Sequence, residues 1–351
     1  MTERIVFHAI DQVGLGHLSR SIAIALAVRE RAPGASILFA VEGSDHGLLA
    51  AAHLPAVPLP SFREPKQWRP WPEAEQRELA SSLCAAVVGS TRPHLIMFDC
   101  FPNPDLVAAA RSRRVPFALS LRGTKDDRAY FAWLAANYPD ALRLIVAHDP
   151  GELDIPAALS ERTRFVGRIT RPMRLETRRG ERHVLITGGG GGYPGTVDFY
   201  NAALAAFARC RREHPGISGT LVVGPLFVEW PGLLTVDGIR IVPFDPELPS
   251  ALAGADLVVC QAGYNTIGEV IASGVAAVCV PAPRMADDQH LRARSAAARH
   301  PRIRVSAADP DALVEAMLSA LREPPRERQP AAVADGAERA AAEILALVEP
   351  A

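Results

Sequence analysis

The chain has 351 residues, of which 48% are apolar and 22% are charged, and its formal net charge is −1. This composition excludes a disordered chain, and the near-neutral charge argues against a nucleic-acid partner, which would need an excess or a stripe of basic residues. The length corresponds to about two domains of ordinary size.

Cysteine spacing and apolar runs bear on the compartment. The five cysteines are an odd number and lie far apart, without a Cys-x-x-Cys pair. We therefore expect buried, reduced thiols and no zinc site. The N-terminus enters a predicted strand without a signal peptide, and no apolar run reaches the about 18 residues of a membrane span. The sequence predicts a cytoplasmic protein without an integral membrane segment.

In the first half of the chain, short apolar runs alternate with helical patterns. Strands are predicted at Arg4–Ile10, Ser36–Val41, Leu95–Phe98, Val115–Leu121 and Leu142–Ala147. Helices are predicted at Leu18–Arg31, Glu73–Val88, Asp127–Tyr138 and from Asn103-Pro104 onward. Strands that alternate with helices in this way are typical of a parallel, doubly wound sheet.

The loop after the first strand contains a candidate base, in the run Gly14-Leu-Gly16-His17-Leu-Ser19-Arg20. His17 begins the following helix, whose N-terminus disfavours the imidazolium form and should keep the ring neutral and able to take a proton. A histidine that caps the helix or packs in the loop is the structural alternative. A dinucleotide-binding loop would require a third glycine where Ser19 stands.

Two further polar residues end strands of the same half. Asp99 and Arg122 should emerge at the same rim of the sheet as His17. Asp99 could orient the ring and stabilise its charged form, as in a Ser-His-Asp triad, or accept hydrogen bonds from amides of its own turn. Arg122 could bind an acceptor or a phosphate, or pair with the acidic residues 126–127.

The loop Phe62–Trp71 interrupts the alternation. It combines two tryptophans with Arg63, Lys66 and Arg69. Aromatic faces stack on sugars, and basic groups attract anionic acceptors or lipid head groups. Packing over the domain's own core is the alternative. The loop is too short to predict a membrane anchor, and peripheral contact with a membrane remains open.

The pattern restarts after the linker Val166–Pro172, which predicts a first domain at 1–168 and a second at 172–325. Its strands are expected at His183–Thr187, Thr220–Val223, Ile239–Val242, Leu257–Cys260 and Ala276–Val280. Its helices are expected at Gly195–Arg212, Asp288–Arg299 and Asp309–Leu321. A last helix should follow the break Pro324–Pro330 and run to about Val348.

Two loops of this second half are predicted to hold a diphosphate. Glycines allow the backbone to approach phosphates closely, and the free amides and dipole of a helix N-terminus form an anion site. A carboxylate one turn into that helix can accept hydrogen bonds from ribose hydroxyls. A flexible turn is the alternative for the glycine run. The residues assigned to the nucleotide are Gly188, Gly189, Gly190, Gly191, Gly263, Asn265, Thr266 and Glu269.

The stretch Asp256-Leu-Val-Val-Cys-Gln-Ala-Gly-Tyr-Asn-Thr-Ile-Gly-Glu269 resembles the donor-binding signature of GT-B glycosyltransferases, and in particular of the bacterial family that adds N-acetylglucosamine to lipid I. The resemblance implies two Rossmann-like domains, each with a doubly wound parallel sheet, that face across a cleft. We expect the two halves to close when the donor binds, with the segment 167–172 as the hinge. It also implies a last helix, 330–351, that crosses back to the first domain.

Individual roles follow from the same resemblance. It implies that His17 is the general base, assisted by Asp99, with Gly16 and Arg122 on the acceptor side. Further implied contacts are those of Phe244 with the base of the nucleotide and those of Gln289 and Asp288 with the donor sugar. Capping of the following helix is the alternative for Asp288.

The expected function is inverting glycosyl transfer from a nucleotide-diphosphate sugar, UDP-linked, to a hydroxyl or amine acceptor that the sequence does not identify. No cofactor or metal is expected, because Asp309-Pro-Asp311 is explained as a helix cap. A nucleotide-sugar hydrolase or 2-epimerase on the same fold is the main alternative, since residues 14–20 also resemble the loop of the hydrolase of the pseudaminic acid pathway. An NAD-dependent dehydrogenase and a non-catalytic nucleotide-sugar-binding protein are the others.

Overall fold

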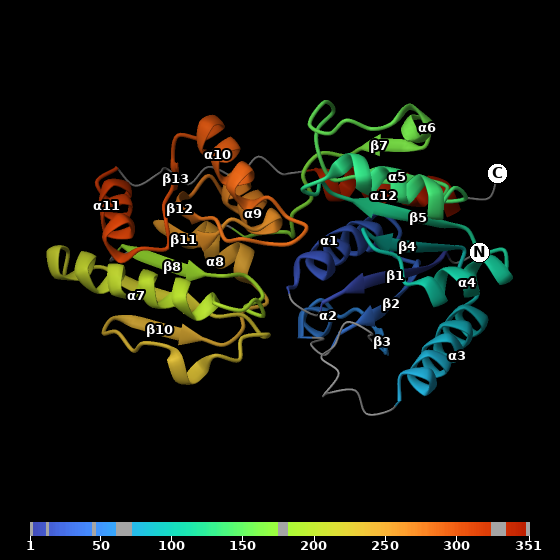
Figure 1. Ribbon diagram of the computed structural model, residues 1–351, viewed down its shortest axis with the longest axis horizontal. Coiled ribbons are helices and arrows are strands. Elements are labelled where there is room, and N and C mark those ends of the chain that lie inside the picture. Colours follow the sequence, from blue (N-terminus) through green and yellow to red (C-terminus); the bar gives the residue numbers. More distant parts are fainter. Residues whose placement is uncertain are drawn as a thin grey trace. The chain divides into compact units, whose positions relative to one another are not determined.

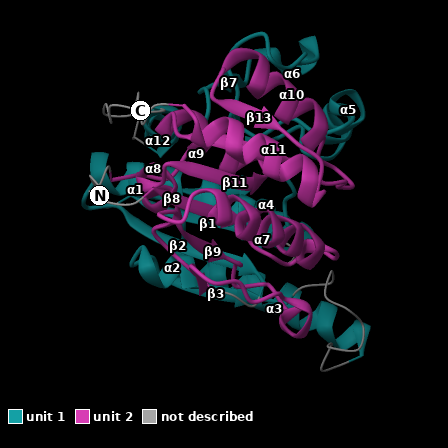
Figure 2. Ribbon diagram, turned by 90° about the vertical axis from the view of Figure 1, so that its left-hand side faces the viewer, with its two compact units in different colours: residues 1–169, 334–351 teal, residues 170–333 magenta. Residues whose placement is uncertain are grey.

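The computed structural model describes residues 3–11, 14–43, 47–60, 72–174, 182–323 and 335–348. They form two units, one of residues 1–169 and 334–351 and the other of residues 170–333, coloured separately in Figure 2. The loop Phe62–Trp71 and the break Pro324–Pro330 lie outside the described residues. None of the helices in the described ranges combines the length and apolar character that a membrane crossing requires.

The first unit is built on a parallel sheet whose described strands have the order β3-β2-β1-β4-β5-β6-β7 (Figure 1). The strands are β1 (Arg4–Ile10), β2 (Ser36–Glu42), β3 (Ala56–Leu59), β4 (Leu95–Asp99), β5 (Phe117–Leu121), β6 (Leu144–Val146) and β7 (Thr163–Phe165). The helices are α1 (Gly16–Arg31), α2 (Gly47–Ala51), α3 (Glu73–Thr91), α4 (Pro104–Ser112), α5 (Asp127–Asn137), α6 (Ala157–Ser160) and α12 (Gly336–Val348).

The second unit repeats this architecture, with a parallel sheet whose described strands have the order β10-β9-β8-β11-β12-β13 (Figure 1). The strands are β8 (His183–Thr187), β9 (Ser218–Val222), β10 (Ile239–Val242), β11 (Leu257–Gln261), β12 (Ala276–Val280) and β13 (Ile303–Val305). The helices are α7 (Thr196–Glu213), α8 (Leu248–Gly254), α9 (Tyr264–Ser273), α10 (Gln289–Arg299) and α11 (Pro310–Leu321), with a 3-10 turn at Trp230–Gly232.

Strand β8 shows why its residues form a strand buried on both faces. Val184 and Ile186 pack in a core with residues of α7 and α11. Leu185 points the other way, into a core formed with residues of α8, α9 and α10. Successive side chains of a strand alternate between faces, so a run that is apolar throughout requires cover on both. All five cysteines of the chain are free and buried, as predicted.

Helix α12 belongs to the first unit, where it packs against α1. Gly336 begins it, and a Cβ atom there would lie 2.3 Å from the carbonyl oxygen of Arg168. Arg339 donates from Nε to the carbonyl oxygen of Val166 at 2.7 Å. The absence of a side chain at Gly336 thus lets the helix start directly against the segment that leaves β7.

Both sheets have a topological switch point, where the order of strands reverses. In the first unit β1 lies between β2 and β4, and in the second unit β8 lies between β9 and β11. The loop that leaves the carboxyl end of β1 leads to His17. The loop that leaves the carboxyl end of β4 begins directly after Asp99. The loops that leave β8 and β11 are the glycine run 188–192 and the start of α9. Ligands of open parallel sheets bind at such points.

Three edge strands were missed by sequence reasoning. Each is short, and β3 contains Pro58. An edge strand tolerates proline because its open side has no neighbouring strand to which a backbone N–H would have to donate. The other two, β7 and β13, have three residues each, too few for a periodic pattern. The expected parallel, doubly wound sheets are confirmed in both units.

Candidate active site

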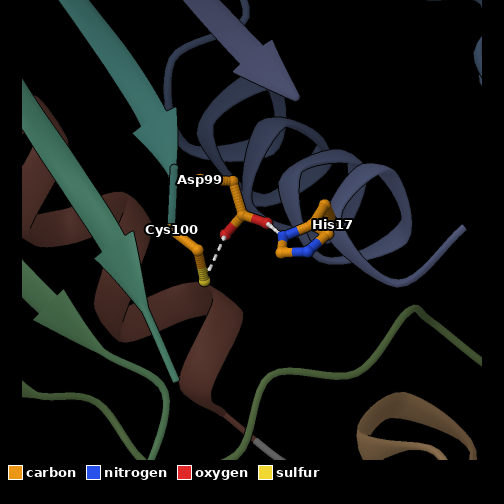
Figure 3. Close-up of side chains that lie close together, drawn as sticks. All are labelled: His17, Asp99 and Cys100. Carbon is orange, nitrogen blue, oxygen red and sulfur yellow. Dashed lines mark hydrogen bonds and ion pairs between the residues drawn. The ribbon is translucent and has the colours of Figure 1, made fainter. Parts of the chain in front are cut away.

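A histidine and an aspartate meet at the switch point of the first sheet. His17 is the second residue of α1, and its Nδ1 lies 2.8 Å from Oδ2 of Asp99, the last residue of β4 (Figure 3). The His17 side chain is 21% exposed and that of Asp99 is 1% exposed. A carboxylate only accepts hydrogen bonds, so Nδ1 carries the proton. In the neutral ring, Nε2 then carries the lone pair that can accept a proton.

The remaining contacts of Asp99 decide between its two alternatives. Arg20 donates from Nε to Oδ1 at 3.0 Å, and its Nη2 lies 2.7 Å from both carboxylate oxygens. Among the described residues, no backbone amide donates to this carboxylate. Asp99 therefore holds side chains of α1 and the Cys100 thiol, which lies 3.9 Å from Oδ1, rather than backbone amides of its own turn.

The electrostatics of the pair differ from the sequence prediction. Burial lowers the pKa of His17, but the hydrogen bonds and charges of Asp99 and Cys100 together raise it by a larger amount. The pKa of His17 therefore lies above its usual 6.5. The sequence prediction considered only the helix N-terminus, which disfavours the imidazolium, and the contact with the Asp99 carboxylate acts in the opposite direction. Burial raises the pKa of Asp99, yet Arg20 and His17 lower it more, so the carboxyl is ionised.

Cys100 completes the group drawn in Figure 3. Its backbone has φ +56°, and its buried thiol lies 3.2 Å from Nη2 of Arg20. Ligand atoms of His17, Asp99 and Cys100 lie within 4.8 Å of one another, close enough to share a cation. However, the guanidinium of Arg20 already donates to both carboxylate oxygens and to the sulfur. A metal ion would have to displace this cation, which makes the cluster a poor metal site.

The other acceptor-side candidates lie near the same edge. Gly16 is the exposed first residue of α1, and Arg122 is half-buried directly after β5. Arg122 donates from Nη1 to the carbonyl oxygen of Gly123 at 2.9 Å. The Phe101 ring, which sequence reasoning did not single out, lies edge-on to the His17 ring with centroids 6.0 Å apart.

In the second unit, two amides of the glycine run already have hydrogen-bond acceptors. The amide of Gly188 donates to Oη of Tyr200 at 3.1 Å, and that of Gly189 donates to Oγ1 of Thr187 at 3.1 Å. These two amides have acceptors within the unit, and their contact with a diphosphate stays a prediction. Among the described residues, the amides of Gly190 and Gly191 have no acceptor.

Gly224, after β9, is a glycine whose replacement should distort this loop. It has φ +90°, and a Cβ atom there would lie 2.2 Å from the carbonyl oxygen of Gly189. We expect Gly224→Ala to cost about 2–5 kcal/mol, combining left-handed strain with a backbone clash. Gly189→Ala, at φ +77° with open space around the added carbon, should cost only about 1–2 kcal/mol. Urea unfolding of both variants measures the difference, and equal midpoints would contradict it.

The predicted nucleotide seat at α9 is partly buried. Gly263 is the N-cap residue, and Asn265 and Thr266 are half-buried in the first turn. The Glu269 side chain is 3% exposed, and its Oε1 lies 3.8 Å from Nε of Arg171. Burial raises the pKa of Glu269 to about 6, although the charge of Arg171 lowers it. The ribose contact stays a prediction, made by a carboxylate that is costly to ionise.

The remaining donor candidates occupy nearby loops. Phe244 is half-buried just after β10. Oδ1 of Asp288 accepts from the amide of Leu291 at 2.8 Å, which is the capping alternative. Gln289 is buried, and its Oε1 accepts from the amide of Ala282 at 3.0 Å. Their roles toward a sugar stay predictions.

Sequence reasoning missed an arginine at this edge. Arg284, in the loop after β12, lies over the ring of Tyr193 at 3.7 Å and donates to Oε1 of Gln261 at 2.6 Å. The three residues come from the loops or strand ends of β8, β11 and β12. Nothing in their spacing indicated that they meet, because the contact depends on the register of the sheet.

The Asp309-Pro-Asp311 motif is a helix cap, as expected. Oδ1 of Asp309 accepts from the amides of Asp311 and Ala312 at 3.1 Å and 3.0 Å. Asp311 pairs with Arg209.

Comparison with known proteins places the second part of the chain. Residues 229–345 match the family model described as the glycosyltransferase family 28 C-terminal domain. The UDP-N-acetylglucosamine--N-acetylmuramyl-(pentapeptide) pyrophosphoryl-undecaprenol N-acetylglucosamine transferase of Burkholderia vietnamiensis is 37% identical over 118 residues, 33% of this chain and 32% of that protein. The enzyme of the same name from Halorhodospira halophila is 35% identical over 142 residues, 38% and 39% of the two chains. The chain thus matches about a third of the length of these relatives, and the predicted resemblance is confirmed there.

Solved structures match over nearly the whole chain. A glycosyltransferase of kitacinnamycin has a TM-score of 0.66 with 18% identity, over 99% of this chain and 100% of that one. The MurG protein of Acinetobacter baumannii has a TM-score of 0.57 with 18% identity, over 99% of each. A UDP-N-acetylglucosamine 2-epimerase from Listeria monocytogenes, described as putative, reaches 0.65 with 12% identity, over 99% and 96%. The fold is GT-B, as predicted.

Proposed function

We propose that this protein is an inverting glycosyltransferase that moves a sugar from a nucleotide-diphosphate sugar, with UDP as the nucleotide, to a hydroxyl or amine of an acceptor, without a bound metal ion. The observation that carries the proposal is the 2.8 Å hydrogen bond between His17 Nδ1 and Asp99 Oδ2 at the switch point of the first sheet. The family match of residues 229–345 supports the second unit as the donor-binding part.

In the proposed reaction, Nε2 of His17 accepts the proton of the acceptor hydroxyl while the oxygen of that group attacks the anomeric carbon. The bond from this carbon to the diphosphate oxygen breaks on the opposite face. The nucleoside diphosphate leaves with the bonding electrons, and the anomeric configuration inverts. Asp99 holds the ring and stabilises the imidazolium that forms.

Fixed backbone donors support the departure of the nucleotide without a metal. The first turn of α9 has amides without acceptors inside the helix, and the amides of Gly190 and Gly191 supplement them. Preorganised donors of this kind stabilise charge that develops on a leaving group. The Asp-x-Asp motif of the chain does not argue for a metal-dependent mechanism, because its first aspartate, Asp309, is used as a helix cap.

Glu269 gives the test of the donor site. We expect Glu269→Gln to weaken UDP binding about 10–100-fold, because hydrogen bonds from ribose hydroxyls to a charged acceptor become hydrogen bonds to a neutral one. In the unmodified protein, affinity should rise as the pH rises through about 6, where Glu269 ionises. Calorimetric titration with UDP at pH about 5 and about 8 measures both effects.

Glu315→Gln, on the exposed face of α11 in the same unit, is the matched control and should leave UDP affinity unchanged. If Glu269→Gln binds UDP as tightly as the unmodified protein at both pH values, the donor-site assignment is wrong. Incubation with UDP-sugars in the absence of an acceptor tests the reaction type. Rapid release of free sugar would indicate the hydrolase, in which water replaces the acceptor.

A further inference from the structure

Arg20 is a buried cation beside the proposed base. It lies three residues after His17 on α1, so both side chains lie on the same side of the helix. It is 2% exposed and is among the largest fully buried side chains of the described residues. Its three hydrogen bonds to Asp99 hold both oxygens of the carboxylate, and a fourth reaches Sγ of Cys100 at 3.2 Å.

The arrangement fixes the direction of the carboxylate. Asp99 has two oxygens, and the guanidinium contacts both of them, while Oδ2 also faces Nδ1 of His17. A planar guanidinium binds a carboxylate in a defined plane, which a point charge does not. Arg20 therefore prevents the carboxylate from rotating away from the imidazole.

The arrangement also places the positive charge of Arg20 next to the negative charge of Asp99, which faces the imidazole. A carboxylate that contacts an imidazole and has no other cation beside it strongly favours the imidazolium, and a protonated ring cannot act as a base. The positive charge of Arg20 opposes that effect. Two other described groups next to the ring are the Cys100 thiol, which also favours the charged form of the imidazole, and the aromatic ring of Phe101. Tyr130 closes the cluster by donating from Oη to the carbonyl oxygen of Cys100 at 2.7 Å.

We propose that Arg20 is a positioning residue for the base: it fixes the Asp99 carboxylate against His17 and offsets enough of its charge for His17 to take a proton near neutral pH. This inference rests on the proposed function. A purely structural role, in which Arg20 only fills space between α1 and the end of β4, would affect folding but leave the titration of His17 unchanged.

The test is an NMR titration of the His17 ring in Arg20→Met and Arg20→Lys, with the signal assigned by its loss in His17→Gln. Arg20→Met should raise the pKa of His17 and move the acid limb of the kcat/KM profile to higher pH. Arg20→Lys keeps the charge, so the limb should stay in place while kcat falls because one ammonium cannot hold the carboxylate plane. An unchanged His17 titration in folded Arg20→Met would overturn the proposal.

A second comparison applies if Arg20→Met does not fold. The double variant Arg20→Met/Asp99→Asn removes both buried charges, so no unpaired charge is left in the interior. Its His17 pKa should lie above that of Asp99→Asn alone, in which Arg20 still repels the imidazolium. Equal values would overturn the proposal. The titrations need no substrate, so a shift without turnover on any donor would refute the proposed function and leave the electrostatic role of Arg20 standing.

Discussion

A His17→Ala variant is expected to lose at least about 100-fold in turnover, because general-base assistance is worth about 10²–10⁴-fold. Its affinity for UDP should stay nearly unchanged, since the nucleotide is assigned to loops of the other unit. The loss should appear in kcat at saturating donor, because the ring acts on the proton that moves in the transition state. Turnover is measured as nucleotide release, and affinity by calorimetry.

His214→Ala is the control, since this exposed histidine follows α7 and takes no part in the proposed chemistry. The unmodified protein should show an acid limb above pH 6.5, because the pKa of His17 is raised and only the neutral ring accepts a proton. The control should keep that limb. Near-normal turnover of His17→Ala would remove the imidazole from the mechanism.

An Asp99→Asn variant is expected to lose both stability and turnover. The guanidinium of Arg20 would remain buried without its anion, which typically costs about 3–5 kcal/mol when one partner of a buried pair is removed. Turnover should fall as well, because the amide holds the imidazole weakly and no longer stabilises its charged form. In a Ser-His-Asp triad, the analogous change costs about 10⁴-fold. Denaturant unfolding and kinetics measure the two losses separately.

Asp140→Asn is the matched control. Asp140 pairs with Arg111 through side chains that are 45% and 44% exposed, so this change should cost only about 0–1 kcal/mol. The folded pKa of Asp99 is depressed, so its stabilisation is present above about pH 3.8 and is lost as the pH falls through the lower folded value. A cost at Asp99 that equals the cost at Asp140 would contradict the buried pair.

Much of the fold was predictable because buried parallel strands are apolar along their whole length. The strand Leu257–Cys260 is an example: its residues alternate between two cores, so neither face could be polar. The edge strands β3, β7 and β13 were not predictable, because they are short and owe their conformation to one neighbouring strand.

The site divides in the same way. His17 and Asp99 could be paired in advance, because the ends of β1 and β4 must lie at one edge of a sheet. The burial of Arg20 could not, since Arg20 lies one turn into α1 and only side-chain packing brings its guanidinium to the carboxylate. The hydrogen bond of Gly188 could not be predicted for a related reason: the acceptor of its amide is Tyr200, which comes from the following helix.

The position of α12 in the chain has a consequence for biosynthesis. Ala337, Ala340, Ala341 and Ile344 are buried, and α12 packs on α1, the helix that begins at Gly16 and carries the imidazole. Residues 170–333 are translated before that cover is made. The residues of the second unit are therefore all synthesised before α12, which covers α1 in the first unit. A chain that ends before Gly336 would contain the whole second unit and an uncovered α1.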